Sequence, residues 1–169
     1  MDYIESGMDF SPLFTSEEFQ SFYIEKSNLY QSIKKDSVKS VEFIVIKNQE
    51  FYFIEAKSSF PANESSKDEQ ILYDKLHHTL DLFIAQNLGL ANHTKSEISE
   101  EFGDKSVLGK DITKFKLHFY LIMSEKFEEK WCKNVLTLLR KKLTPLRKIW
   151  DIEVKVITEQ EARRLNFIQ

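Results

Sequence analysis

The sequence predicts an α/β fold in which helices flank a mixed central β-sheet. Two apolar runs, residues 40–47 and 50–57, are rich in Val, Ile, Phe and Tyr and are separated by two residues, a pattern typical of a β-hairpin. Beyond the hairpin, stretches of helical periodicity alternate with short β-type runs, as in a sheet covered by helices. The length of 169 residues suits one domain, residues 1–169, with a single well-covered core.

Two helices are predicted around the hairpin from the spacing of apolar residues. Residues 16–35 are expected to form a helix with Ser16 as its N-cap, and residues 67–90 a long helix that Gly89 ends. The apolar stripe of the first helix is Phe19, Phe22, Leu29 and Ile33, and that of the second is Ile71, Leu72, Leu76, Leu80, Phe83, Ile84 and Leu88. Both stripes are expected to pack on the sheet.

The C-terminal third continues the alternation of strands and helices. Residues 115–123 are predicted to be an internal strand, and residues 152–156 a strand with alternating polarity. Between them lies a basic amphipathic helix that ends near Pro145, and a short helix is expected from Glu159 onward. The resulting sheet mixes the hairpin with strands that arrive after helical connections.

Two connections interrupt this pattern. Pro61 and residues 63–66 separate the hairpin from the long helix. Residues 91–114 show little periodicity and carry several charges, and they are longer than an ordinary connection. We expect this second segment to be a mobile insertion, and a substrate lid is the alternative.

The hairpin turn predicts which residues oppose each other. With Asn48 and Gln49 as the two-residue loop, the opposed pairs are Lys47 with Glu50, Ile44 with Phe53, and Glu42 with Glu55. Lys57 lies two residues beyond Glu55 on the same face. Because like charges directly opposite are destabilising, a positive group is expected between the glutamates. A rim of solvated charges in which Lys57 pairs with one glutamate is the alternative.

Both faces of the hairpin are apolar in the middle. One face is Glu42, Ile44, Ile46, Phe51, Phe53, Glu55 and Lys57, and the other is Val41, Phe43, Val45, Tyr52, Ile54 and Ala56. Strands with two apolar faces are covered on both sides. The charges therefore gather at the end of a buried hairpin, away from its turn.

This arrangement resembles the active-site core of the PD-(D/E)XK nuclease superfamily, the fold of many restriction endonucleases, Holliday-junction resolvases and defence nucleases. Glu42 matches the first acid, and Glu55-Ala56-Lys57 matches the (D/E)-x-K motif on the next strand. Val41-Glu42 lacks the Pro of the family pattern and has Glu in place of Asp. The resemblance implies a restriction-endonuclease-like core, although no counterpart of that core's first strand is evident before residue 39 unless the first helix unwinds there.

The resemblance also implies a metal site and a reaction. Glu42, Glu55 and the carbonyl of Ala56 would bind Mg²⁺ or Mn²⁺, and Lys57 would position or activate the attacking water. Glu25, on the first predicted helix, would join the catalytic site as a glutamate does in many members. A partly exposed glutamate paired with a nearby lysine is the alternative for Glu25.

Four further residues are candidates for substrate binding. Ser58 and Ser59 directly follow the lysine and could contact phosphate. Gln70 and Tyr73 on the long helix resemble the Q-x3-Y feature of RecB-like nucleases, with a spacing one residue shorter.

Composition constrains the compartment and the partners. The single cysteine, Cys132, excludes an internal disulfide and suits the cytoplasm, and no signal peptide or membrane span is expected. The net charge is −3, but residues 1–25 hold six acids and no Lys or Arg, whereas residues 126–148 hold eight bases and two acids. The basic segment could follow a phosphate backbone or could be an ordinary solvated helix surface.

The function expected from these observations is that of a Mg²⁺-dependent endonuclease, which hydrolyses phosphodiester bonds of DNA in bacterial or phage defence, restriction or repair. DNA is the expected partner, with a homodimer or a larger defence complex as further possibilities and no membrane. The alternative is a binding or assembly module that keeps the nuclease fold and acts through protein or nucleic-acid contacts without cleavage. The acidic N-terminal quarter and the modest total basicity motivate that alternative.

Overall fold

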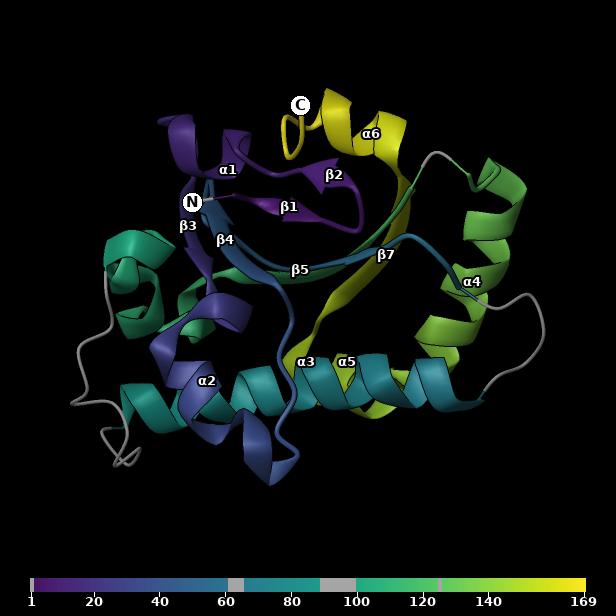
Figure 1. The fold of residues 1–169 in the computed structure, drawn as a ribbon. Coiled ribbons are helices and arrows are strands. Elements are labelled where there is room, and N and C mark those ends of the chain that lie inside the picture. Colours follow the sequence, from purple (N-terminus) through teal and green to yellow (C-terminus); the bar gives the residue numbers. More distant parts are fainter. Residues whose placement is uncertain (1, 61–65, 89–99, 125) are drawn as a thin grey trace.

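The computed structural model describes residues 2–60, 66–88, 100–124 and 126–169 (Figure 1). Its centre is a five-stranded sheet with the strand order β3-β4-β5-β6-β7. The first three strands are antiparallel neighbours, and β5, β6 and β7 run parallel. The strands are β3 (Gln20–Tyr23), β4 (Phe43–Lys47), β5 (Glu50–Lys57), β6 (Lys116–Met123) and β7 (Glu153–Thr158). The predicted mixed sheet of an α/β fold is thereby confirmed.

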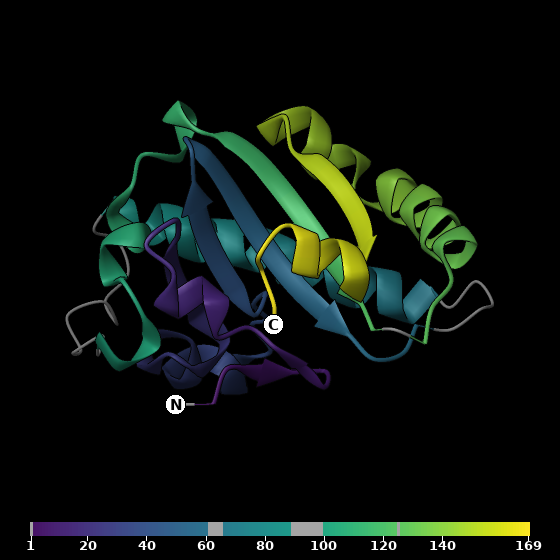
Figure 2. The ribbon, with the colours of Figure 1, turned by 90° about the horizontal axis from the view of Figure 1, so that it is seen from above.

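Two layers cover this sheet, one on each face (Figures 1 and 2). One layer contains α3 (Ser66–Asn87), α4 (Glu129–Lys142) and α5 (Thr144–Trp150). The other contains the small hairpin of β1 (Ile4–Glu5) and β2 (Met8–Asp9), then α1 (Pro12–Thr15) and α6 (Glu159–Arg164). The remaining helical segments are α2 (Asn28–Ile33), η1 (Ile24–Lys26), η2 (Lys34–Asp36), η3 (Glu100–Phe102), η4 (Lys105–Gly109) and η5 (Ile112–Lys114).

The central hairpin forms with the predicted register. Ile44 pairs with Phe53 and Lys47 with Glu50. Asn48 and Gln49 both have positive φ, +50° and +62°, which is the conformation of a two-residue type I′ turn. A tight turn of this kind leaves only one register available, so the pairing of the two strands follows from the local sequence.

The turn also predicts a stabilising substitution. Gln49→Gly should raise the free energy of unfolding by about 1 kcal/mol, because a residue with a Cβ atom is strained at positive φ and glycine is not. Urea denaturation of the two proteins measures the difference. Gln31→Gly, within α2, is the control and should destabilise by about 1–2 kcal/mol, because it adds a glycine to a helix and removes the hydrogen bond from Gln31 Nε2 to the Glu25 carbonyl (2.6 Å).

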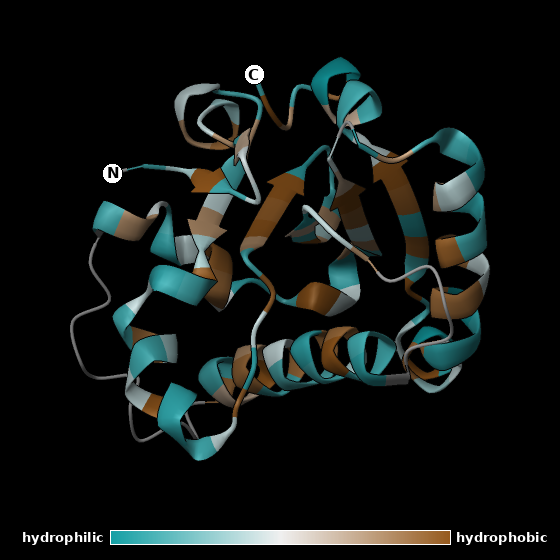
Figure 3. Cartoon of the chain, turned by 45° about the vertical axis from the view of Figure 1, so that its right-hand side comes forward, coloured by the Kyte–Doolittle hydropathy of each residue, from teal (hydrophilic) through white to brown (hydrophobic). Residues whose placement is uncertain are grey.

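The two faces of the hairpin are buried in separate apolar clusters, as predicted. Ile44, Phe51 and Phe53 pack with α3 and α4, whereas Phe43 and Ile54 pack with the N-terminal segment and α6. Figure 3 shows the hydrophobic strands enclosed between helices whose outer surfaces are hydrophilic. A charged group at the end of this hairpin is therefore held by an apolar scaffold on both sides.

The predicted helix over residues 16–35 is wrong. Gln20–Tyr23 is instead the edge strand β3, which pairs with β4, and only Asn28–Ile33 is α-helical. Phe22 and Tyr23 point to opposite faces and are both fully buried, so the twofold alternation of a strand is hidden in the sequence. The apolar residues of this segment are spaced as in a helix, but hydrogen bonding to β4 stabilises the strand conformation of Gln20–Tyr23. A strand therefore does precede the hairpin: it is β3, for which the sequence showed no evident candidate.

The other predicted elements form near their expected bounds. Leu72, Leu76, Leu80 and Phe83 of α3 are buried as predicted, but Leu88 is 65% exposed. Gly89, Pro61 and residues 63–65 lie outside the described residues. The strands β6 and β7 and the helix α6 confirm the C-terminal prediction, and Thr158 with Glu161 forms the capping box that starts α6.

The basic helix ends where expected, and a second basic helix follows. It is α4, which ends at Lys142, and Pro145 lies in the first turn of α5. Proline is tolerated there because its missing N–H would have no intrahelical partner. The basic residues of 126–148 are consequently distributed over two helices.

Part of the predicted insertion, residues 91–114, packs on the sheet. Residues 91–99 lie outside the described part, and residues 100–114 contain three 3₁₀ helices with Val107, Leu108 and Ile112 buried. Gly103 forms a β-bridge to Phe22 with φ +107°. A Cβ atom at Gly103 would lie 2.2 Å from the Ser21 carbonyl oxygen, so only glycine allows this approach to β3.

Among the described residues, no helix combines the length and apolar character needed to cross a bilayer.

Candidate functional site

The candidate site lies at the end of the central hairpin that is remote from its turn. β5 carries Glu55, Ala56 and Lys57 at its C-terminal end, and Glu42 lies at a bend directly before β4. The Val41 N–H donates to Thr79 Oγ1 on α3 (3.0 Å), and Val41 packs in the same cluster as Ile44. Strict alternation would place residues 41 and 44 on opposite faces, so the chain departs from regular strand geometry at Glu42.

This departure changes the predicted pairing of Glu42 with Glu55. The ladder ends at Phe43 with Ile54, and the Glu42 N–H donates to the Ile54 carbonyl (3.1 Å). The Glu42 carboxylate accepts the N–H of Ala56 through Oε2 (2.7 Å) and thus replaces a backbone acceptor. Glu42 and Glu55 are therefore not a ladder pair.

Glu42 is a buried carboxylate, only 5% exposed. Burial raises its pKa well above the ordinary value, the charge of Glu55 raises that pKa further, and Lys75 lowers it. The charge of Glu55 thus disfavours the ionisation of Glu42. Because two adjacent buried carboxylates resist carrying charge together, the position favours a cation.

Glu55 is completely buried and is held by two lysines. Its Oε1 lies 2.7 Å from Lys75 Nζ and 3.5 Å from Lys57 Nζ. Its Oε2 is buried without a hydrogen-bond partner among the described residues. Burial raises the pKa of Glu55, and the two lysines oppose that effect. One carboxylate oxygen is consequently available to a ligand.

Lys75, on α3, is a residue of the candidate site that the sequence prediction missed. Its side chain is 13% exposed, and the Glu55, Glu25 and Glu42 carboxylates raise its pKa although burial alone would lower it. Lys75 lies three residues after Leu72 and four before Thr79, both completely buried. A lysine at that spacing within an apolar stripe was the signal available in the sequence.

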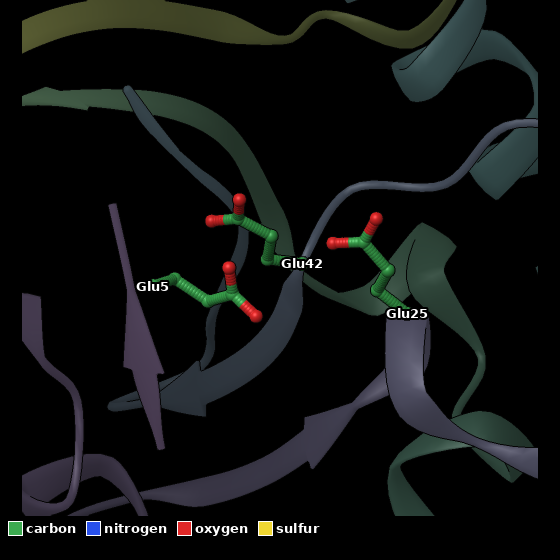
Figure 4. A group of neighbouring side chains, drawn as sticks. All are labelled: Glu5, Glu25 and Glu42. Atoms are coloured by element: carbon green, nitrogen blue, oxygen red, sulfur yellow. The ribbon is translucent and has the colours of Figure 1, made fainter. Parts of the chain in front are cut away.

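Glu25 and Glu5 extend the acidic site (Figure 4). Glu25 lies in η1, directly after β3, and its N–H donates to the Glu42 carbonyl (3.4 Å). Glu5, from β1, was not among the predicted residues. One carboxylate oxygen from each of Glu5, Glu25 and Glu42 lies within 4.8 Å of the other two. Three segments distant in sequence therefore bring carboxylates to one point.

The predicted substrate residues occupy two different positions. Ser58 and Ser59 are exposed directly after Lys57. Gln70 Nε2 donates to Asp74 Oδ1 (2.6 Å), and Tyr73 is partly buried against the core below α3. Ser58 and Ser59 are thus placed beside the site, whereas Gln70 is engaged within its own helix.

The Ala56 backbone is the remaining component of the predicted metal site. Its carbonyl oxygen accepts a hydrogen bond from Ser6 Oγ (3.1 Å), and its N–H is bonded to Glu42. Both polar groups of Ala56 thus face the carboxylates and the small N-terminal hairpin.

The charges of the site do not balance. Four carboxylates, those of Glu5, Glu25, Glu42 and Glu55, are accompanied by Lys57 and Lys75 and by Lys26, whose Nζ lies 3.6 Å from Glu5. Lys26 is 53% exposed, so water screens its contribution. When all four carboxylates are ionised, a bound cation stabilises the site.

Comparison with known proteins does not assign this site. The chain matches no protein-family model, no curated protein and no solved structure. What the site does must be inferred from its own residues.

Proposed function

We propose that this protein is a metal-dependent nuclease that hydrolyses phosphodiester bonds of DNA. The observation that carries the proposal is the meeting of Glu42 and Glu55 with Lys57 and Lys75 at one end of a buried hairpin. Phosphodiester hydrolysis requires a site for a divalent cation and a cationic group beside the nucleophile, and these four side chains supply both.

The order of elements supports a restriction-endonuclease-like core. The superfamily core has a helix, three strands, a helix and a strand, and the chain has α1, β3, β4, β5, α3 and β6 in that order. The short helix α2 is inserted between β3 and β4. The resemblance of Glu42, Glu55 and Lys57 to the PD-(D/E)XK motif therefore coincides with a similar arrangement of elements.

The donor set suits Mg²⁺ or Mn²⁺. Hard divalent cations prefer oxygen ligands and usually bind through one or two carboxylates while keeping several waters. Glu42, the free oxygen of Glu55 and the Ala56 carbonyl are the oxygens offered, with Glu25 beside them. In an ion pair that is purely structural, both carboxylate oxygens of Glu55 should have hydrogen-bond partners. Glu55 Oε2 has none among the described residues, so it is open to a ligand.

Each residue has a distinct task in the proposed reaction. Bound Mg²⁺ would polarise the scissile phosphate and lower the pKa of a coordinated water. Lys57, 29% exposed and 3.5 Å from Glu55, is placed to orient the nucleophile and to stabilise charge that develops on phosphate. Lys75, which is closer to Glu55 and less exposed, opposes the rise that burial causes in the pKa of that carboxyl.

The proposed setting is bacterial or phage defence, restriction or repair in the cytoplasm. Cleavage of both strands of a duplex by one active site per chain would require a second copy, so a homodimer or a larger complex belongs to the proposal. The basic helices α4 and α5 are a candidate surface for the phosphate backbone.

The test is a cleavage assay on DNA with Mg²⁺ or Mn²⁺. Lys57→Ala should reduce the cleavage rate by about 100-fold or more, because it removes a charge that acts on the developing oxyanion. Its melting temperature should stay near that of the wild type, since Lys57 is partly exposed. Lys114→Ala, which removes an exposed lysine of η5 outside both the site and the basic helices, is the matched control and should cleave normally.

Two results would contradict this function. A wild-type protein that cuts neither DNA nor RNA with either metal would exclude a nuclease. If that inactive protein still bound Mn²⁺, the alternative of a binding or assembly module would be favoured.

A further inference from the structure

We propose that the exposed side of α4 binds the phosphate backbone of double-stranded DNA. This surface, the α4 basic face, consists of Lys130, Lys133, Asn134, Thr137, Arg140 and Lys141. The inference rests on the proposed function for the choice of DNA, and it deepens that function by naming the form of the substrate and the surface that holds it. The residues of this face lie outside the carboxylate and lysine site at the end of the hairpin.

Helical spacing gathers these six residues on one side of α4. They lie 3, 4, 7, 10 and 11 positions after Lys130, and a helix of 3.6 residues per turn brings such positions to the same side. All six are exposed, whereas Cys132, Val135 and Leu139 on the other side are buried. Four of the six are cationic, and the other two carry an amide or a hydroxyl that can also donate to phosphate.

The apolar side of α4 is buried against the sheet, which argues against a lipid partner. Val135 and Leu139 share an apolar cluster with Val154 and Val156 of the edge strand β7, and Figure 2 shows α4 beside that strand. Arg140 Nη2 donates to the Val154 carbonyl (3.3 Å) across this contact. A basic amphipathic helix binds an anionic bilayer by burying its apolar side among the lipids. In the folded protein that side is already occupied, so the α4 basic face has only its charges and donors to offer.

Contacts within the protein do not account for the charge of this face. The helix macrodipole favours cations in the last turn, where Arg140 and Lys141 lie, but disfavours a cation in the first turn, where Lys130 lies. Lys133 is paired with Glu129 (2.8 Å), whereas Lys130 and Lys141 have no ion-pair partner among the described residues. Lys130 is therefore unfavourable for the helix and unpaired within the described chain, as expected of a residue that contacts an external anion.

The composition of the face favours a duplex over a single strand. Proteins that bind single strands stack the bases on exposed aromatic rings. Trp131 is the only aromatic residue of α4, and it is partly buried against the core and stacked on Phe127, with 6.3 Å between the ring centroids. The α4 basic face thus offers cations and hydrogen-bond donors but no ring. Such groups hold the sugar–phosphate backbone of a duplex without reading its sequence.

The face is long enough to follow a duplex backbone, and it begins at the sheet edge that carries the candidate site. Lys130 and Lys141 are about 16 Å apart along the helix axis, and duplex DNA carries about one charge per 1.7 Å of its axis. Met123, the last residue of β6, pairs with Lys57, and the Ser124 N–H donates to the Lys57 carbonyl (3.1 Å). Because α4 begins five residues after Ser124, a backbone held on this face starts beside the strand ends that carry Lys57.

Fluorescence anisotropy of a short labelled DNA duplex tests the inference, with the full chain and a chelator that prevents cleavage. The triple variant Lys130→Gln, Lys133→Gln and Lys141→Gln should bind at least about 10-fold more weakly at about 0.1 M salt. It should also reduce the slope of log K against log salt by about 3, because each lost phosphate contact removes about 0.9. Glutamine is a good helix former and the three positions are exposed, so the melting temperature should not change.

The matched control is the triple variant Lys34→Gln, Lys105→Gln and Lys114→Gln, which removes three exposed lysines outside α4. It changes the net charge equally and should bind the duplex as the wild type does. Equal weakening by the two triple variants would assign binding to total charge and overturn the inference. Should the α4 variant have a lower melting temperature, Lys130→Gln alone decides: a slope reduced by about 1 supports the inference, and an unchanged slope overturns it.

Two further probes test the assigned partner. A single strand of the same length that binds more tightly than the duplex would overturn the assignment of double-stranded DNA. Phosphatidylcholine vesicles that contain phosphatidylserine test a lipid partner. If the α4 variant lost vesicle binding while its duplex binding stayed unchanged, the face would serve an anionic membrane and the inference would be wrong.

The outcomes separate this inference from the proposed function. If the wild type binds the duplex through α4 but cuts no nucleic acid, the inference stands and the nuclease proposal fails. If the wild type cleaves DNA and the α4 variant binds and cleaves equally well, the nuclease proposal stands and the inference fails. A wild type that does not bind the duplex even at low salt overturns the inference, whatever its cleavage activity.

Discussion

Replacing Lys75 with methionine should lower the free energy of unfolding by about 3–5 kcal/mol, the cost of leaving a buried charge without its partner. Methionine keeps most of the buried stem and removes the ammonium that lies 2.7 Å from the fully buried Glu55. Lys57 cannot compensate, because it lies farther from the same oxygen and is more exposed. The loss should shrink as the pH falls, since Glu55 then becomes neutral by taking up a proton.

Urea denaturation near pH 7.5, with a chelator present, measures this effect. Lys133→Met is the matched control: its 2.8 Å pair with Glu129 is exposed on α4, and its removal should cost less than about 1 kcal/mol. The double variant Lys75→Met with Glu55→Gln should recover much of the lost stability, because no buried charge then remains. A loss below about 1 kcal/mol for Lys75→Met alone would show that the pair does not carry the charge assigned to it.

Replacing Glu42 with glutamine should stabilise the metal-free protein and raise its free energy of unfolding at neutral pH by about 1–3 kcal/mol. Glutamine can still accept the Ala56 N–H, and it removes a charge that burial and Glu55 both disfavour. The pKa of Glu42 is raised in the folded protein. Protonated Glu42 therefore contributes fully to the free energy of unfolding at a pH below 4.5, the ordinary pKa of a glutamate, and this contribution is lost as the pH rises through the folded-state pKa. The advantage of the variant should therefore be absent at low pH and grow as the pH rises.

Thermal or urea unfolding between pH 4.5 and 8 checks this dependence. Addition of Mn²⁺ at about 100 times its dissociation constant should stabilise the wild type by about 2.7 kcal/mol and leave Glu42→Gln nearly unchanged. The order of the two stabilities would then reverse with metal, as expected where a site sacrifices stability for function. A variant that is less stable than the wild type without metal at neutral pH would argue for Glu42 as a structural residue. Glu17→Gln should show neither the pH dependence nor the metal dependence.

The central hairpin could be predicted from the sequence because its determinants are local. A two-residue turn at Asn48-Gln49 and the twofold period of the flanking residues leave one register, and that register is the one observed. The strands β6 and β7 were predictable for a similar reason, since apolar runs of their length bounded by polar residues have few alternatives. The placement of Glu55 and Lys57 on one face of β5 could be predicted by counting residues from the same turn.

The segment before the hairpin could not be predicted in this way. β3 is an edge strand of four residues whose Ser21, Phe22 and Tyr23 are all buried, so neither face of the strand shows the polar, solvent-exposed pattern that marks a half-buried strand in a sequence. Its partner β4 lies about twenty residues away, and Gly103 from a distant segment covers its outer edge. The residue preferences within a short stretch of sequence cannot predict contacts with segments this far away in the chain.

Residues close together in the chain are sufficient to specify the hairpin, its two apolar faces and the position of Glu55 and Lys57 at its charged end, because strand period and turn geometry act over neighbouring residues. Packing between distant segments is what takes Glu42 out of the ladder to bond the Ala56 N–H, brings Lys75 from α3 to Glu55, and brings Glu5 and Glu25 to Glu42. These contacts connect residues separated by up to 37 positions, from Glu5 to Glu42. Such contacts are set by how the layers pack on the sheet, and no local pattern in the chain encodes that packing.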